Sequence, residues 1–166
     1  MFFCRMSEKK PIFALKNILS EKFIHPTNQG NLLRNDDLLV LWNSIHDNTT
    51  YIFDQVDGQW GYIRHIKSGM VWHPYGGPSK STTRGTKICL HSDRGRHALW
   101  ALDQVNNHIV HRDGFYVHYH QGQNPYPPNG DTLVLWDEVH GGMKWKFVNP
   151  DNLKEEVRPY GLRFVF

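Results

Sequence analysis

The chain has 166 residues and a formal net charge of +3; 39% of its residues are hydrophobic and 13% are aromatic. This length and composition predict a single globular domain and exclude an intrinsically disordered chain. The lysines and arginines are spread along the sequence without forming a basic cluster, so we expect no nucleic-acid partner.

The first residues do not have the pattern of a targeting signal. The apolar run that begins at Met1 is broken at Arg5, which is too early for a signal peptide. No stretch approaches the roughly 20 apolar residues of a membrane helix, so we expect no membrane insertion. We therefore expect cytoplasmic synthesis and, for any extracellular role, release by an unconventional route. Cys4 and Cys89 have no metal-binding or redox spacing, and we expect free thiols.

A short motif centred on histidine occurs three times. It reads Phe-Ile-His-Pro, Val-Trp-His-Pro and Tyr-Val-His-Tyr, and the histidines, His25, His73 and His118, stand 48 and 45 residues apart. An apolar segment and then an aromatic segment follow each copy in the same order. This recurrence predicts three copies of one structural unit. The apolar segments are residues 39–42, 88–91 and 133–136, and the aromatic segments are residues 51–56, 99–105 and 145–148.

Each unit has the pattern of four short strands separated by turns. In the second unit we expect strands at residues 62–66, 70–73, 87–91 and 99–105, with Gly-, Ser- and Pro-containing turns between them. A propeller with this repeat length needs at least about four blades to close, whereas three units suit a capped barrel. The sequence therefore predicts an all-β chain with the β-trefoil fold and pseudo-threefold symmetry.

The repeats also predict how the chain is divided. We expect a flexible leader at residues 1–9, a β-trefoil domain at 10–150, and a C-terminal tail at 151–166 whose apolar end, residues 162–166, closes the barrel. The repeats are expected at residues 10–58, 59–106 and 107–150. The aromatic residues expected to fill the shared core are Phe53, Trp100, Trp145 and Phe147.

Two segments of the second repeat resemble the mytilectin family of mussel lectins: His-Pro-Tyr-Gly-Gly at residues 73–77 and Leu-His-Ser-Asp at 90–93. The resemblance extends over residues 12–150 almost without gaps. It implies a β-trefoil without enzymatic activity or cofactor, which binds galactose or N-acetylgalactosamine at one site in each repeat. The family's site joins a His-Pro-x-Gly-Gly loop to a His-x-Asp-x-His segment. Further similar segments are residues 22–26, 60–65 and 124–129.

These residue types suit the chemistry of galactose. A carboxylate can accept hydrogen bonds from two neighbouring sugar hydroxyls, and an imidazole can donate or accept as each hydroxyl requires. Paired glycines let the backbone approach the sugar closely and adopt a positive φ. An aromatic ring can cover the apolar face of the sugar.

The resemblance implies three sites of unequal completeness. The second has the full loop but Gly95 in place of the last histidine, the third has Glu138 at the aspartate position, and the first has Ser44 there. We therefore rank the second site first, the third next and the first last. The expected sugar-binding residues are His73, Pro74, Tyr75, Gly76, Gly77, His91 and Asp93 in the second site; His118, Gly122, Trp136, Glu138 and His140 in the third; and His25, Pro26, Trp42 and His46 in the first.

Two tryptophans, Trp42 and Trp136, stand where the second repeat has His91. One interpretation makes them stacking platforms for a second sugar, which would favour a longer glycan. The other makes them a roof over the core, since tryptophan is large and usually half-buried. The sequence favours neither.

Other functions are less consistent with the sequence. His118 and His120 would share one face of a strand, but no further ligand at metal-binding spacing completes a zinc site, so we expect no metal. No serine or cysteine nucleophile stands in a glycine-flanked turn, so we expect no enzyme. The strongest alternative is a β-trefoil protein-interaction module or inhibitor whose sugar sites have degenerated.

The resemblance also bears on partners. It implies recognition of galactose-type glycans, on glycolipids or glycoproteins, in innate defence. Members of the family often pair through aromatic residues that follow the acidic residue of the second repeat, where this chain has Gln104 and Val105. We therefore expect either a monomer or a homodimer with a different interface.

Overall fold

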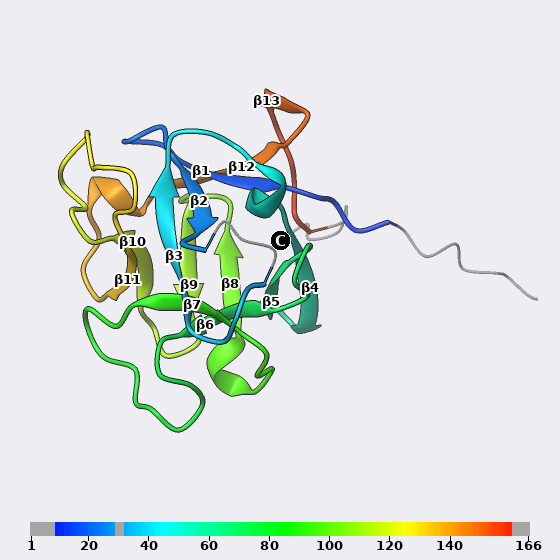
Figure 1. Ribbon diagram of the computed structural model, residues 1–166, viewed down its shortest axis with the longest axis vertical. Helices are drawn as coiled ribbons and strands as arrows, with labels where there is room; N and C mark the ends of the chain where they lie inside the picture. The colour runs from blue at the N-terminus through cyan, green and yellow to red at the C-terminus, as the bar shows by residue number, and fades with distance from the viewer. Residues whose placement is uncertain (1–8, 29–31, 161–166) are drawn as a thin grey trace, which may run out of the picture.

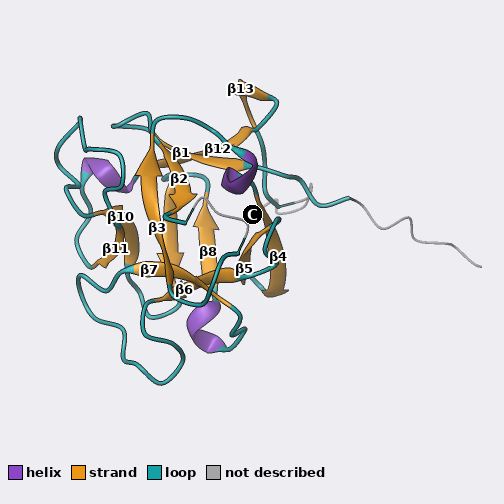
Figure 2. Cartoon of the chain, viewed as in Figure 1, coloured by secondary structure: helices purple, strands orange, loops and turns teal. Residues whose placement is uncertain are grey.

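The computed structural model describes residues 9–28 and 32–160. They form short strands and three single turns of 3-10 helix (Figures 1 and 2). The first repeat contains β1 (Ala14–Asn17), β2 (Phe23–Pro26), β3 (Asp37–Trp42), η1 (Asp47–Thr49) and β4 (Tyr51–Asp57). The second contains β5 (Trp60–His65), β6 (Val71–Pro74), β7 (Ile88–His91), η2 (Arg96–Ala98) and β8 (Trp100–Asp103). The third contains β9 (His108–His111), β10 (Tyr116–Tyr119), β11 (Leu133–Trp136), η3 (Gly141–Met143) and β12 (Trp145–Asn149), and β13 (Asn152–Glu156) follows it.

The first and fourth strands of the repeats form a closed barrel. β1 pairs with β12, β4 with β5, β5 with β8 and β8 with β9, all antiparallel. A bridge between Phe13 and Tyr51 joins β1 to β4, and the Trp145 amide donates to the Asn107 carbonyl, 2.8 Å away, beside β9. The second and third strands form hairpins that meet one another where β3 pairs with β7. This confirms the predicted β-trefoil.

A hydrogen bond repeated in all three units ties the barrel to the hairpins. The indole of Trp100 donates to the Trp72 carbonyl at 3.0 Å, and the indole of Trp145 donates to the Val117 carbonyl at 3.1 Å. In the first repeat the Tyr51 hydroxyl donates to the Ile24 carbonyl at 3.3 Å. Each accepting residue directly precedes one of the repeated histidines, so the core aromatics hold the strand that carries the histidine. The predicted core aromatics Phe53, Trp100, Trp145 and Phe147 are all buried in the main core cluster.

A second set of hydrogen bonds joins each repeat to the one before it. The side chain at the end of the first strand is fully buried in every repeat, and it donates to a carbonyl in the 3-10 turn of the preceding repeat. Because the first repeat bonds to the third, the set is cyclic. The pairs are Asn17 and Gly142 at 2.9 Å, His65 and Asn48 at 2.9 Å, and His111 and His97 at 2.8 Å.

The two histidines of this set are held in one neutral form. Nδ1 of His65 accepts the Ser68 amide hydrogen and Nδ1 of His111 accepts that of Asp113, each at 3.2 Å. Nε2 therefore carries the proton that is donated to the carbonyl. Burial lowers the pKa of both imidazoles, because a charged ring loses its hydration there.

The C-terminal tail differs from the expectation in one respect. The polar segment β13 pairs with β12, a strand that the sequence analysis did not predict. The Tyr160 hydroxyl accepts the Leu102 amide hydrogen at 2.9 Å, and its ring packs edge-on against Phe53. Residues 162–166, predicted to close the barrel, lie outside the described residues, as does Cys4. Cys89 is a buried free thiol, and none of the helical segments in the described ranges is long and apolar enough to cross a membrane.

Candidate carbohydrate-binding sites

Each predicted site is built on a buried histidine at the end of the second strand of its repeat. In His25, His73 and His118, Nδ1 lies against the carbonyl of the following residue, Pro26, Pro74 or Tyr119. A carbonyl only accepts hydrogen bonds, so Nδ1 carries the proton. In the neutral rings of His25 and His118 this leaves Nε2 as an acceptor for a sugar hydroxyl. At His73, Nε2 faces the Asp93 carboxylate, which only accepts, so this nitrogen is not free to accept from a sugar.

In the first site, Trp42 and His46 surround His25. Their ring centroids lie 6.0 and 5.4 Å from that of His25. Ser44 places its hydroxyl 3.2 Å from Nε2 of His46, and within the described part of the chain Nε2 of His25 is buried without a hydrogen-bond partner. Burial and, to a smaller degree, the neighbouring His46 lower the pKa of His25. Among the residues that the structure describes, the first site therefore holds an unused acceptor but no carboxylate in contact with His25.

In the second site, the Asp93 carboxylate lies against the corresponding nitrogen of His73. Its Oδ2 lies 3.1 Å from Nε2 of His73 and also accepts the Gly95 amide hydrogen at 3.1 Å. The ring of His91 lies 4.9 Å from that of His73, and its Nδ1 accepts the Asp93 amide hydrogen at 2.9 Å. The structure thus brings a carboxylate and two imidazoles together.

The glycine loop of the second site follows the predicted geometry only in part. Gly76 and Gly77 have φ values of +101° and +80°, which favour glycine, and a Cβ on Gly77 would lie 3.7 Å from Nε2 of His91. Tyr75 is 42% exposed, and the Lys80 ammonium lies 5.6 Å from its ring centroid. Among the described residues, no hydrogen bond or ring contact joins Tyr75 to the site histidines.

His97 also lies at the second site, a position not predicted from the sequence. Gly95 stands where the other repeats have His46 and His140, but His97 brings an imidazole to 6.2 Å from His73. The η2 turn makes this approach possible because it curls the chain back toward the site two residues after Gly95. The position of a ring in such a turn does not follow from matching residues in the repeats.

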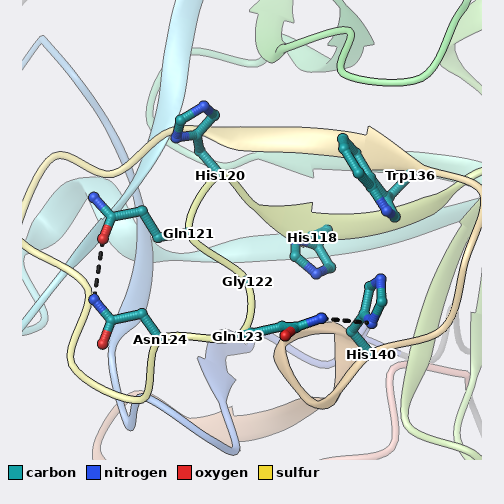
Figure 3. Close-up of a pocket in the computed structure, with 8 residues that line it drawn as sticks. All are labelled: His118, His120, Gln121, Gly122, Gln123, Asn124, Trp136 and His140. Atoms are coloured by element: carbon teal, nitrogen blue, oxygen red, sulfur yellow. Dashed lines mark hydrogen bonds between the residues drawn. The ribbon is translucent and has the colours of Figure 1, made fainter.

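In the third site, His118 lies in a pocket below Trp136 and beside His140 (Figure 3). Trp136 stacks at 27° with its centroid 6.0 Å away, and His140 lies edge-on at 5.6 Å. A Cβ on Gly122 would lie 1.2 Å from Cε1 of His118, so only glycine fits where the loop crosses the imidazole. The lining residues are His118, His120, Gln121, Gly122, Gln123, Asn124, Trp136 and His140.

The polar groups of the third site are only partly paired. The Gln123 amide lies 3.2 Å from Nδ1 of His140, whereas Nε2 of His118 is buried without a partner in the described ranges. Burial is the main cause that lowers the pKa of His118, and the nearby His140 adds to it. His118 thus offers the same acceptor as His25 in the first site.

Glu138 lies on the rim of the third site. Its Oε2 lies 3.6 Å from Nε2 of His140, and its Oε1 accepts a hydrogen bond from Nη2 of Arg84 at 3.0 Å. The Arg84 guanidinium carbon also lies 4.4 Å from the ring centroid of Trp136. Trp136 therefore lines the pocket and also packs against a cation. Both Trp42 and Trp136 are half-buried and lie outside the main core cluster.

The histidines that suggested a metal do share the third pocket. His118, His120 and His140 all line it. No group of three or more His, Cys, Asp or Glu side chains in the described residues has an arrangement that could hold a metal ion.

Part of the chain is similar in sequence to a known lectin. An alpha-D-galactose-binding lectin of Mytilus galloprovincialis is 43% identical over 56 residues, which are 34% of this chain and 30% of the relative. The match thus spans about a third of that relative's length.

The solved structures that are similar have low sequence identity and show the fold alone. The designed threefold-symmetric protein ThreeFoil has a TM-score of 0.72 at 16% identity, covering 83% of this chain and 98% of that one. The C-half of an earthworm R-type lectin, solved with GalNAc, has a TM-score of 0.63 at 14% identity, covering 84% of this chain and 98% of that one.

One family match covers the three repeats that carry the sites. The MytiLec family model, described as alpha-D-galactose-binding lectin, matches residues 13–150, which span all three repeats. This confirms the resemblance first seen in the loop and acidic segments of the second repeat. The chain belongs to the MytiLec family of lectins.

Proposed function

We propose that the protein is a lectin that binds galactose- or N-acetylgalactosamine-terminated glycans at up to three shallow surface sites, without catalysis. The observation that carries this proposal is the buried imidazole repeated as His25, His73 and His118 and fixed through Nδ1 in each site. At His25 and His118, Nε2 is open to accept from a sugar hydroxyl, and at the second site the Asp93 carboxylate beside the imidazole is the acceptor. Sugar hydroxyls donate to such acceptors, and the family to which the chain belongs is described by alpha-D-galactose binding.

The second site has the most complete set of groups for a sugar. Asp93 is 28% exposed, so its carboxylate can still accept hydrogen bonds from neighbouring hydroxyls beside His73. The third site has the acidic Glu138 on its rim, and the first has the hydroxyl of Ser44. The order second, third, first remains our prediction.

Each site alone is expected to bind weakly. A shallow site for one sugar suits dissociation constants near the millimolar level, about −4 kcal/mol. Sites on one rigid domain, or in a homodimer, raise the effective concentration for glycans clustered on glycolipids or glycoproteins. Recognition of cell-surface or microbial glycans after unconventional release fits this multivalency, and it belongs to the same proposal.

A glycan array tests the function directly. The purified protein is compared with Asp93→Ala and Glu138→Ala, and with Asp57→Ala, which removes an exposed carboxylate on the β4–β5 hairpin. We expect signals on terminal galactose or N-acetylgalactosamine that fade in the first two variants and persist in the third. A blank array with a folded protein would contradict the proposal, and a β-trefoil that binds protein would become the leading account.

A further inference from the structure

The loop before β7 extends from the second repeat along the edge of the third site. The Gly85 amide donates to the Leu135 carbonyl, and the Leu135 amide donates to the Thr86 carbonyl, both at 2.8 Å. A backbone bridge between Lys87 and Val134 continues this pairing. The segment is therefore fixed against β11 through its backbone, independently of its side chains.

The same contact occurs at the other two sites. The Asp36 amide donates to the Leu90 carbonyl at 2.9 Å, and the Gly130 amide donates to the Leu41 carbonyl at 2.8 Å. Asp36, Gly85 and Gly130 all have positive φ, at +71°, +83° and +88°. The residue before each of them consequently occupies an equivalent position beside a site of the next repeat. These residues are Asn35 at the second site, Arg84 at the third and Asn129 at the first.

The three equivalent residues make different contacts. Asn35 accepts the Ser92 amide hydrogen at 2.8 Å, directly before Asp93, and Asn129 accepts a hydrogen bond from the Lys22 ammonium at 2.8 Å. Among the three, only Arg84 carries a charge, and it alone engages the acidic group of its site. Its Nε pairs with Asp137 at 2.6 Å and its Nη2 with Glu138 at 3.0 Å.

We propose that Arg84 is a positioning residue of the third site, contributed by the second repeat. It binds one oxygen of Glu138, and the other oxygen then lies 3.6 Å from His140, where a galactose hydroxyl can donate to it. The guanidinium also packs against Trp136 and holds that ring at the pocket wall. The assignment rests on the proposed galactose binding. It also distinguishes the third site from the other two, because each of those has an asparagine at this position.

NMR titration with galactose measures the affinity of each site separately in one sample. The Gly122 amide and the Trp136 indole report on the third site, and the Gly77 amide reports on the second. In Arg84→Ala we expect third-site affinity to fall about threefold to tenfold, the range for an exposed pair supported by stacking, while second-site affinity stays unchanged. Lys154→Ala, which removes an exposed cation on β13 away from the three sites, is the control.

A double-mutant cycle with Glu138→Gln separates positioning from a merely structural role. If Arg84 acts through Glu138, Arg84→Ala adds little further loss in the Glu138→Gln background, and Arg84→Lys recovers only part of the affinity because lysine lacks the planar fork. Equal losses in both backgrounds, or an unchanged third-site affinity in Arg84→Ala, would overturn the assignment. A wild-type protein in which neither site responds to galactose would instead overturn the proposed function, and the assignment with it.

Discussion

Asp93 binds His73 through an oxygen that lies 3.1 Å from Nε2 of the imidazole, so the carboxylate and the ring form one unit. A sugar hydroxyl that reaches this unit meets a negative acceptor already held in place. Neither the first nor the third site has a carboxylate in direct contact with its central histidine among the described residues. The second site is therefore where loss of one charge should have the clearest effect.

Asp93→Asn is expected to weaken galactose binding at the second site by roughly tenfold to a hundredfold. Hydrogen bonds to a charged group are worth about 1.5–3 kcal/mol, and the amide retains the shape but not the charge. Isothermal titration and the Gly77 amide signal measure this change. Glu155→Gln, on the exposed strand β13, is the control. Affinity equal to that of the wild type would exclude Asp93 as a sugar ligand.

Gly122→Ala should disturb the third site by overpacking. The new methyl group would lie 1.2 Å from Cε1 of His118, so the loop or the ring has to move, at a cost of about 1–3 kcal/mol. We expect a lower thermal midpoint and loss of the third-site galactose response. At Gly141 the nearest contact of a Cβ is Leu19 Cδ2 at 3.6 Å, so Gly141→Ala should change neither quantity. A normal response in Gly122→Ala would contradict the described loop.

The stability of the protein should fall on acidification through His65 and His111. Their folded-state pKa lies below the ordinary value of 6.5, so the neutral form that donates to the neighbouring repeat is favoured by folding. The stability they contribute is complete above pH 6.5 and is lost as the pH falls from 6.5 through the lowered pKa. Each unit of lowering corresponds to about 1.4 kcal/mol.

Asparagine variants test this pH dependence, because Asn17 fills the same position in the first repeat without titrating. Denaturant unfolding of His65→Asn and His111→Asn between pH 7.5 and 5 should show a shallower loss of unfolding free energy than the wild type. The exposed Ser81→Asn, which introduces an asparagine without removing an imidazole, should leave the slope as it is. Parallel curves for all variants would show that the buried imidazoles do not control acid stability.

The repeated aromatic hydrogen bond is most cleanly tested in the first repeat. Tyr51→Phe removes only a hydroxyl and leaves the buried Ile24 carbonyl without its donor, so we expect a loss of about 1–3 kcal/mol of unfolding free energy. Tyr62→Phe removes an exposed hydroxyl that bonds to the Arg94 carbonyl and should cost less than about 0.5 kcal/mol. Chemical denaturation compares the two, and similar losses would argue against a special role for the Tyr51 bond.

The repeat pattern was sufficient to predict the fold and the equivalent histidines. His25, His73 and His118 lie at matching positions because each is the third residue of the same four-residue strand in its hairpin, and strand periodicity is visible in a sequence. The core aromatics were predictable for the same reason. β13 was not, because its residues are all exposed and it exists through pairing with β12 and not through an apolar face of its own.

Contacts that depend on turn geometry or on a neighbouring repeat were not predictable from the aligned repeats. His97 approaches His73 because the chain turns back in η2, and Arg84 approaches Glu138 because backbone pairing places one loop against the next hairpin. The pairing of this loop with the next hairpin also determines which groups surround Trp136. Trp136 lines a pocket and packs against a guanidinium, a combination that neither interpretation of the sequence had included.

The cyclic hydrogen bonds from Asn17, His65 and His111 leave the β-trefoil without a terminal repeat. In a linear array, an outermost unit has one neighbour and can fray before the others do. Here every unit both donates to one neighbour and accepts from the other, so opening any one of them breaks two junctions. The three units are thus expected to unfold together in one cooperative transition. A repeat whose site binds sugar weakly is therefore expected to be as stable as the repeat whose site binds most tightly.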